Sequence, residues 1–177
     1  VIASIAIQLC LGTSYIWGVF QQGIAVHLFN GENAGAGLAF SILLSMLTLG
    51  STLGGYLQSR YGTRPVIIVG GIVLAIGFFL ASFTPPAMGW LIWITYGVIG
   101  GFGMGMTYST SIACCQQWFP DKRGLITGII VSALGFGGVL FTPLAERLII
   151  TYGGQTPGIG ELVSFRIFSL IFLVVCS

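Results

Sequence analysis

Few side chains in this sequence could carry out chemistry. His27 is the only histidine of the chain, and it follows an apolar run, so neither a serine–histidine pair between facing helices nor a metal-ligand cluster is expected. The cysteines lie inside apolar runs without the spacing of a zinc site or a disulfide framework. They are Cys10, Cys114, Cys115 and Cys176. The sequence therefore predicts no catalytic residue, no metal and no cofactor, and the chain is not expected to be an enzyme.

Polar side chains in the first apolar segment could instead bind a solute. On a helix, several small or polar residues of this segment fall within about 80° of one another. They are Ser4, Gln8, Gly12, Tyr15 and Gln22. An amide inside hydrocarbon needs a partner or water, so we expect Gln8, Tyr15 and Gln22 to line a water-accessible cavity. Hydrogen bonding between helices is the alternative. Trp17 lies on the opposite face and is expected to meet lipid or a neighbouring helix.

Tyr108 lies on a stripe of small residues in the fourth apolar segment. Gly97, Gly101 and Gly105 recur every four residues, so they share one helix face along which two backbones can approach closely. Tyr108 lies on the same stripe. It is a candidate to hydrogen-bond a substrate, and sealing of the helix-packing seam is the alternative.

A second polar stripe runs along the second apolar segment. Its hydroxyl side chains cluster within about 60° of one another on a helix. They are Ser41, Ser45, Thr48 and Thr52. These hydroxyls either line a cavity or bond back to carbonyls of their own helix, and the sequence leaves both open.

The composition places the chain in a membrane. Hydrophobic residues make up 55% and charged residues only 6%, and the mean hydropathy is +1.01. A soluble domain carries about a quarter charged residues, so lipid must be the main solvent here. We therefore expect an integral membrane protein, and no nucleic-acid partner.

The apolar segments predict an all-α polytopic fold with six transmembrane helices in one domain, residues 1–177. The expected helices are 1–26, 35–58, 65–83, 89–117, 124–149 and 164–177. The last is shorter than the ~20 residues that a bilayer span needs, so we expect it to be truncated and the chain to be a fragment.

The basic residues predict the orientation. Those in the second and fourth connections outnumber those that flank the odd connections, which places the even connections and the N-terminus in the cytoplasm. The former are Arg60, Arg64, Lys122 and Arg123, and the latter are Arg147 and Arg166. We expect the plasma (inner) membrane as the location. Asp121 could pair with Arg123, Arg60 or Arg64 as a gate between the two basic loops, and an exposed pair of this kind is weak.

Three stretches carry a resemblance to a known family. The basic turn reads Gly55-x-Leu57-x-x-Arg60-x-Gly62-x-Arg64. It resembles the loop between the second and third helices of the major facilitator superfamily, with Ser59 where that family usually has an aspartate. Gly62 suits a helix end and Pro65 the start of the next helix.

The other two stretches are Gly12-Thr13-Ser14-Tyr15-Ile16-Trp17-Gly18-Val19-Phe20 and Trp118-Phe119-Pro120-Asp121-Lys122-Arg123-Gly124. They resemble the first helix and the loop before the fifth helix of the oxalate/formate antiporter family and related monocarboxylate carriers.

The resemblance implies the N-terminal six-helix half of a secondary transporter for a small organic anion, a mono- or dicarboxylate, that works by antiport or symport. In that family aromatic side chains of the first, fourth and fifth helices enclose the carboxylate. Tyr15 and Tyr108 match the first two positions, and Leu134 stands at the third. The family's cationic substrate residue belongs to the C-terminal half, which is the expected partner of this chain.

Other functions are the alternatives. A carrier of a neutral solute or a drug within the same superfamily comes first. A water channel of the Asn-Pro-Ala type is disfavoured, because the only asparagines are Asn30 and Asn33, both in the first connection.

Overall fold

The computed structural model describes residues 2–12, 16–29, 33–84, 88–153 and 159–176. Within these ranges the chain is almost entirely helical and contains no strand. In lipid, backbone groups must be satisfied inside the segment, which a helix does by itself. The all-α fold class predicted from the sequence is confirmed.

The helices follow the apolar segments of the sequence. They are α1 (Ile2–Leu11), α2 (Trp17–Leu28), α3 (Asn33–Tyr61), α4 (Thr63–Ala81), the π-helix η3 (Trp93–Gly100), α5 (Gly101–Trp118), the 3-10 helix η4 (Pro120–Lys122), α6 (Arg123–Gly153) and α7 (Ile159–Cys176). By length and composition, three described helical segments could cross a membrane: Ala34–Tyr61, Thr63–Ala81 and Pro120–Thr151.

The predicted ranges differ from the observed helices most clearly in three places. The expected helix 1–26 is occupied by two helices, and α1 ends directly before Gly12, a residue that favours helix C-termini. The expected helix 89–117 changes from π-helix to α-helix at Gly101. The last helix, α7, begins at Ile159 rather than at residue 164 and has 18 residues.

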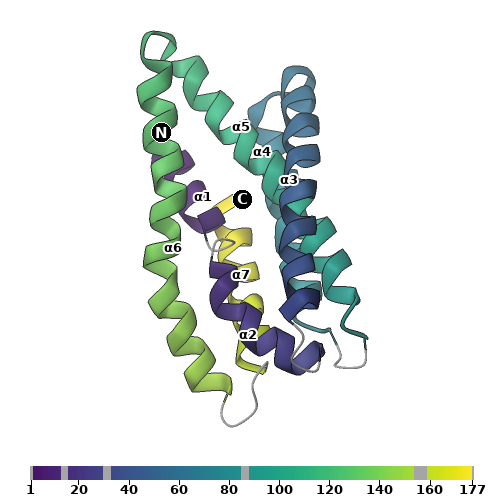
Figure 1. Cartoon of the computed structure of the whole chain (residues 1–177). Coiled ribbons are helices and arrows are strands. Elements are labelled where there is room, and N and C mark those ends of the chain that lie inside the picture. Colours follow the sequence, from purple (N-terminus) through teal and green to yellow (C-terminus); the bar gives the residue numbers. More distant parts are fainter. Residues whose placement is uncertain (1, 13–15, 30–32, 85–87, 154–158, 177) are drawn as a thin grey trace.

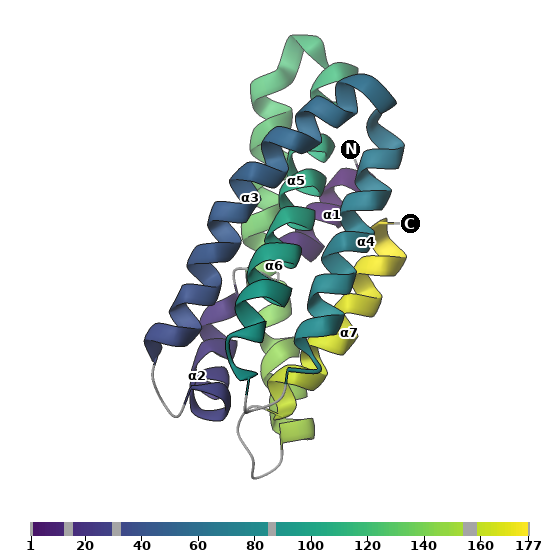
Figure 2. The same ribbon diagram turned by 90° about the vertical axis from the view of Figure 1, so that its right-hand side faces the viewer.

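The helices form a bundle with two long arms. In Figure 1, α5 and α6 meet at the upper end and diverge below it, with α1 and α7 lying between α6 and the pair α3–α4. Figure 2 shows α5 running between α3 and α4, and α7 running along α4. These views agree with the closest helix pairs, which are α3 with α5, α4 with α5, and α4 with α7. The α3–α4 turn and the α5–α6 connection lie at the same end, which we call the basic end.

Glycines allow α5 to lie directly against α3. A methyl group on Gly101 would approach the carbonyl oxygen of Leu43 to 2.6 Å, and one on Gly105 would meet the backbone of Leu47 and Ser51. Such backbone contact is what a small-residue stripe permits in a membrane bundle. The predicted close-packing face of the fourth apolar segment is confirmed.

Aromatic side chains form the core at the other end of the bundle. Trp17 of α2 stacks on Tyr96 of η3 with ring centroids 4.4 Å apart. Phe78 of α4 meets Tyr96 edge-on at 5.2 Å and Phe172 of α7 at 5.0 Å. Trp17 therefore meets a neighbouring helix, one of the two environments expected for it.

The turn between α3 and α4 is tight. Gly62 has φ 86°, and its N–H donates to the carbonyl oxygen of Gln58 at 3.0 Å. A positive φ of this kind favours glycine. Pro65 follows in the first turn of α4, where it needs no intrahelical N–H bond. The predicted role of Gly62 at the helix end is confirmed.

Candidate functional site

Gln8 is the most buried of the predicted binding residues that the structure describes. Its side chain has an exposed fraction of 0%. The Nε2 donates to the Oγ of Ser111 at 2.9 Å and to the carbonyl oxygen of Tyr108 at 3.4 Å. The Oε1 has no hydrogen-bond partner among the described residues. In this conformation Gln8 therefore links α1 to α5, which is the interhelical alternative left open by the sequence.

A second bond lies one helical turn from this link. The thiol of Cys115 donates to the Oγ of Ser4 at 3.0 Å. Ser4 precedes Gln8 by four residues, and Cys115 follows Ser111 by four, so the two bonds lie one turn apart on both helices. The Oγ of Ser111 also donates to the carbonyl oxygen of Tyr108 at 3.0 Å. Together these bonds form a polar ladder between α1 and α5 beside Tyr108.

The other predicted binding residues are not all gathered here. Tyr108 is half-buried and packs against the apolar core. Tyr15 lies outside the described residues. Gln22 is exposed on α2. Gln8 lies on α1, which ends at Leu11, and Gln22 lies on the separate helix α2, so one helical phase does not relate them. Among the candidates that the structure describes, only Gln8 and Tyr108 are brought together.

The polar stripe of α3 is exposed and bonded to its own helix. Each hydroxyl donates to the carbonyl oxygen four residues earlier, at 3.0 to 3.3 Å. The residues are Ser41, Ser45, Thr48 and Thr52, all exposed. Back-bonding satisfies each donor, while the exposed face remains available to a partner or to water.

At the basic end, the motif residues are exposed. They are Gly55, Arg60, Gly62 and Arg64 from the α3–α4 turn, and Asp121, Lys122 and Arg123 from the α5–α6 connection. The guanidinium of Arg60 lies over the ring of Tyr56, 5.5 Å from its centroid.

The predicted gate pair is not formed in this conformation. The structure describes no ion pair between Asp121 and Arg123, and both side chains are exposed. Residues two apart along a helical turn do not face each other, which explains why these two fail to meet.

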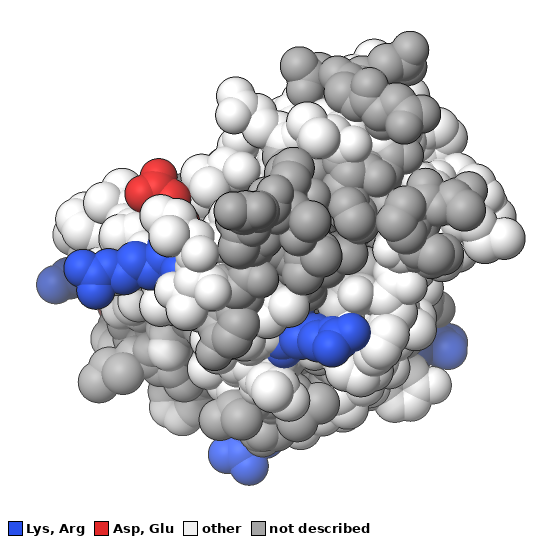
Figure 3. Space-filling model, turned by 90° about the horizontal axis from the view of Figure 1, so that it is seen from below, with Lys and Arg blue, Asp and Glu red and all other residues white. Residues whose placement is uncertain are grey.

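The opposite end carries more scattered charge. Glu146 and Arg147 are exposed on α6, and Arg166 is exposed on α7. Seen from this end, the described basic side chains are separated by uncharged surface (Figure 3). The Nε of Arg166 donates to the Oγ of Ser82 at 3.2 Å, and its guanidinium lies 4.4 Å from the ring centroid of Phe83. Arg166 therefore fastens α7 to the end of α4.

The polar ladder is a neutral site. Every charged side chain whose burial the structure describes is exposed. No group of histidine, cysteine and carboxylate side chains that could hold a metal occurs among the described residues. The four side chains of the ladder are buried and bonded to one another, so in this conformation the ladder holds α1 against α5 and contains no ionised partner for an anion.

Sequence reasoning missed two features. The buried Tyr96 lies on a π-helix, which an α-helical period does not indicate. Gly12, directly after α1, also faces Gly137 of α6, so that a methyl group on Gly12 would lie 2.7 Å from the Cα of Gly137. The signal for this contact was a glycine in each segment, but their pairing depends on how α1 crosses α6.

Comparisons with known proteins find a matching family model and several similar transporters. A family model described as Major Facilitator Superfamily matches residues 2–177. An uncharacterized MFS-type transporter of Escherichia coli, YhjX, is 30% identical over 86% of this chain and 37% of its own length. Monocarboxylate transporter 13 of Rattus norvegicus is 30% identical over 96% of this chain and 38% of its own length. Apicoplast pyruvate carrier 1 of Toxoplasma gondii is 26% identical over 84% of this chain and 34% of its own length. The chain thus spans between a third and two fifths of the length of these three relatives.

Proposed function

Because this chain belongs to the Major Facilitator Superfamily, we propose that it forms the N-terminal six-helix half of a secondary transporter for a small organic anion. A second half would complete the central cavity, and the two halves would rock about a site near the middle of the membrane. The N-terminus and the basic end would face the cytoplasm, as the excess of Arg and Lys there favours.

One observation carries the substrate class. Relatives named as a monocarboxylate transporter and as a pyruvate carrier match 96% and 84% of this chain, so the likeness is not confined to one motif. Mono- and dicarboxylates, including the oxalate and formate suggested by the first-helix stretch, form the substrate panel to be tested.

Within this half, the polar ladder would lie behind one wall of the site, because its four side chains are buried. Tyr108 and Tyr15 would offer aromatic surface and hydroxyl groups, and Gln22 would meet the solute nearer the other end. Gln8 would act from behind the wall, because its Nε2 is bonded to Ser111 and to the carbonyl oxygen of Tyr108. The cationic partner of the anion would come from the second half, since the charged side chains described in this half are exposed.

The same neutral wall favours a second candidate, a carrier of a neutral solute or a drug. A neutral solute needs hydrogen-bond donors and acceptors rather than an ionised partner. The two candidates differ in whether the second half holds a cation inside the membrane.

The test is counterflow in proteoliposomes that contain the full-length product of the gene. Vesicles are loaded with unlabelled pyruvate, lactate, oxalate or formate, and uptake of the same labelled anion is followed. Saturable counterflow of at least one of these anions, absent with glucose, supports the organic-anion carrier. Counterflow of a neutral solute without any anion would overturn it.

This chain alone provides the control. One half exposes a single wall of the cavity, so we expect no saturable uptake from the isolated 177-residue chain. Uptake by the chain alone would contradict the role of a half that needs its partner.

A further inference from the structure

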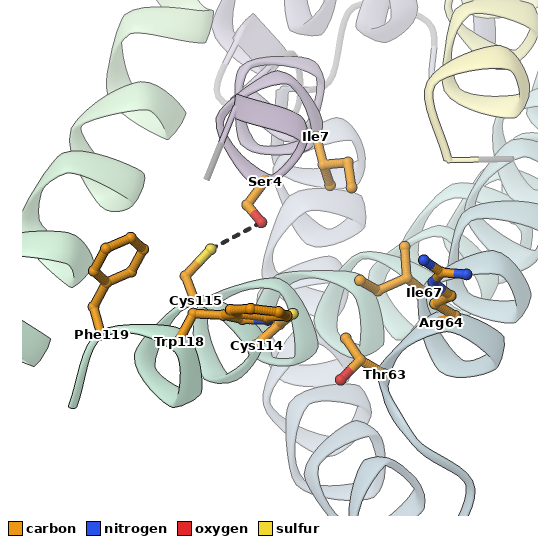
Figure 4. Close-up of a pocket in the computed structure, with 9 residues that line it drawn as sticks. All are labelled: Ser4, Ile7, Thr63, Arg64, Ile67, Cys114, Cys115, Trp118 and Phe119. Carbon is orange, nitrogen blue, oxygen red and sulfur yellow. Dashed lines mark hydrogen bonds between the residues drawn. The ribbon is translucent and has the colours of Figure 1, made fainter.

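A cavity lies at the basic end, beside the Cys115–Ser4 bond of the polar ladder, and both of these residues line it. Its volume is about 390 Å³. Figure 4 shows Thr63, Arg64 and Ile67 of α4 on one side, Cys114 and Trp118 of α5 on the other, and Ile7 of α1 closing a third side. Three helices that are distant in the sequence therefore form one concave site.

The cavity joins a cation to an apolar wall. Arg64 is exposed, and no ion pair to it is described. Ile67 beside it on α4, Ile7 of α1 and the large indole of Trp118 on α5 supply apolar surface. A free inorganic anion would satisfy Arg64 but would leave this apolar wall uncovered, whereas an amphiphile would cover both.

The surroundings favour an anion at the polar end of such an amphiphile. Arg60, Lys122 and Arg123 lie at the same end, opposed by the single described carboxylate of Asp121. Arg64 also stands in the first turn of α4, so the helix dipole adds to the positive potential.

We propose that this cavity binds an anionic phospholipid, with the lipid phosphate against Arg64 and Thr63 and the glycerol and upper acyl chains against Ile7, Ile67 and Trp118. Basic pockets between membrane helices are known to take lipid headgroups, and Trp residues favour the membrane–water interface. The phospholipid would brace α1, α4 and α5 at this end. This inference does not depend on which solute the protein transports.

The test is native mass spectrometry of the purified full-length product of the gene after equilibration with equal amounts of phosphatidylglycerol and phosphatidylcholine. We expect the wild-type chain to retain phosphatidylglycerol about fivefold over phosphatidylcholine. In Arg64→Gln the two lipids should be retained about equally. Arg123→Gln is the matched control, because it removes the same charge from the same end without touching the cavity, and it should keep the preference within a factor of about two.

A second variant fills the cavity without altering its charge. Ile67→Trp should lower phosphatidylglycerol retention although Arg64 remains. If any variant fails to fold, quenching of the tryptophan fluorescence of the wild-type chain is measured instead. Phosphatidylglycerol with acyl chains brominated near the glycerol should quench the wild-type chain more than brominated phosphatidylcholine, and Trp118→Phe should remove the difference.

Several outcomes would overturn the proposal. They are equal retention of the two lipids by the wild-type chain, equal loss in Arg123→Gln and Arg64→Gln, unchanged retention in Ile67→Trp, or quenching without preference for phosphatidylglycerol. Displacement of the lipid by millimolar inorganic phosphate would show a site for the free anion, and would also overturn it.

Discussion

The Nε2 of Gln8 donates a hydrogen bond of 2.9 Å to the Oγ of Ser111, and so joins the first helix to a helix 103 residues further along the chain. Gln8 is fully buried, and its Oε1 has no partner among the described residues. The bond is therefore only partly favourable to stability, since an unpaired buried acceptor costs free energy.

Two substitutions of Gln8 distinguish the contribution of its hydrogen bond to stability from the contribution of its side-chain volume. Gln8→Leu removes the bond together with the unpaired Oε1, so we expect a loss of stability of about 1 kcal/mol or less. Gln8→Ala also leaves a void and should cost about 2 kcal/mol or more. Thermal unfolding in detergent, followed by circular dichroism, measures both. A larger loss in Gln8→Leu than in Gln8→Ala would contradict this account.

The same pair can be tested for function. If Gln8 acts through Ser111 and Tyr108, then Gln8→Leu and Ser111→Ala should each lower anion counterflow, and the double variant should lose less than the product of the two effects. Independent losses would mean that Gln8 and Ser111 do not act as a unit.

Gly105 should not tolerate a side chain. A methyl group there would meet the backbone of Leu47 and Ser51, so Gly105→Ala should force α5 away from α3 and cost about 1–3 kcal/mol. Gly128→Ala is the control, because nothing lies within 4 Å of the added methyl group on α6. This variant should be neutral or more stable by up to about 1 kcal/mol. Equal unfolding temperatures for the two variants would exclude the close approach.

The turn at Gly62 can be tested in the same way. With φ 86°, Gly62→Ala places a Cβ in the left-handed region and should cost about 1–2 kcal/mol. Gly55→Ala, inside α3 with open space around it, should be neutral or stabilising. Equal destabilisation of both would argue against a strained turn.

The Asp121→Asn variant tests whether Asp121 acts in a gate during transport or in a contact that stabilises the fold. Because the structure describes no ion pair between Asp121 and Arg123, the unfolding temperature of this variant should stay within about 1 °C of wild type. A change in transport rate without a change in unfolding would then show that Asp121 pairs in another conformation. Unchanged transport would remove the gate hypothesis.

Arg166 should stabilise the contact between α7 and α4. Arg166→Gln removes the cation from the ring of Phe83 and weakens the bond to Ser82, and we expect a loss of about 0.5–1 kcal/mol. Arg147→Gln, an exposed arginine on α6, should change the unfolding free energy less. The opposite order would show that the ring contact contributes little.

Patterns local to the sequence predicted a large part of this protein. The scarcity of charge predicted a membrane protein and the apolar runs predicted helices, because each of these follows from the solvent and from hydrogen bonds within one segment. Glycine spacing predicted the close-packing face, and the basic turn predicted both Gly62 at the helix end and the superfamily, which the family model confirms.

The tertiary structure decided which of these residues meet. Only the crossing of α1 over α5 pairs Gln8 with Ser111 rather than with water, and only the end of α1 at Leu11 takes Gln22 out of phase with Gln8. Likewise, α1, α4 and α5 must come together before Arg64, Trp118 and Ile7 enclose a cavity. A periodic pattern specifies one face of one helix, but the partner of that face depends on the packing of all the helices at once.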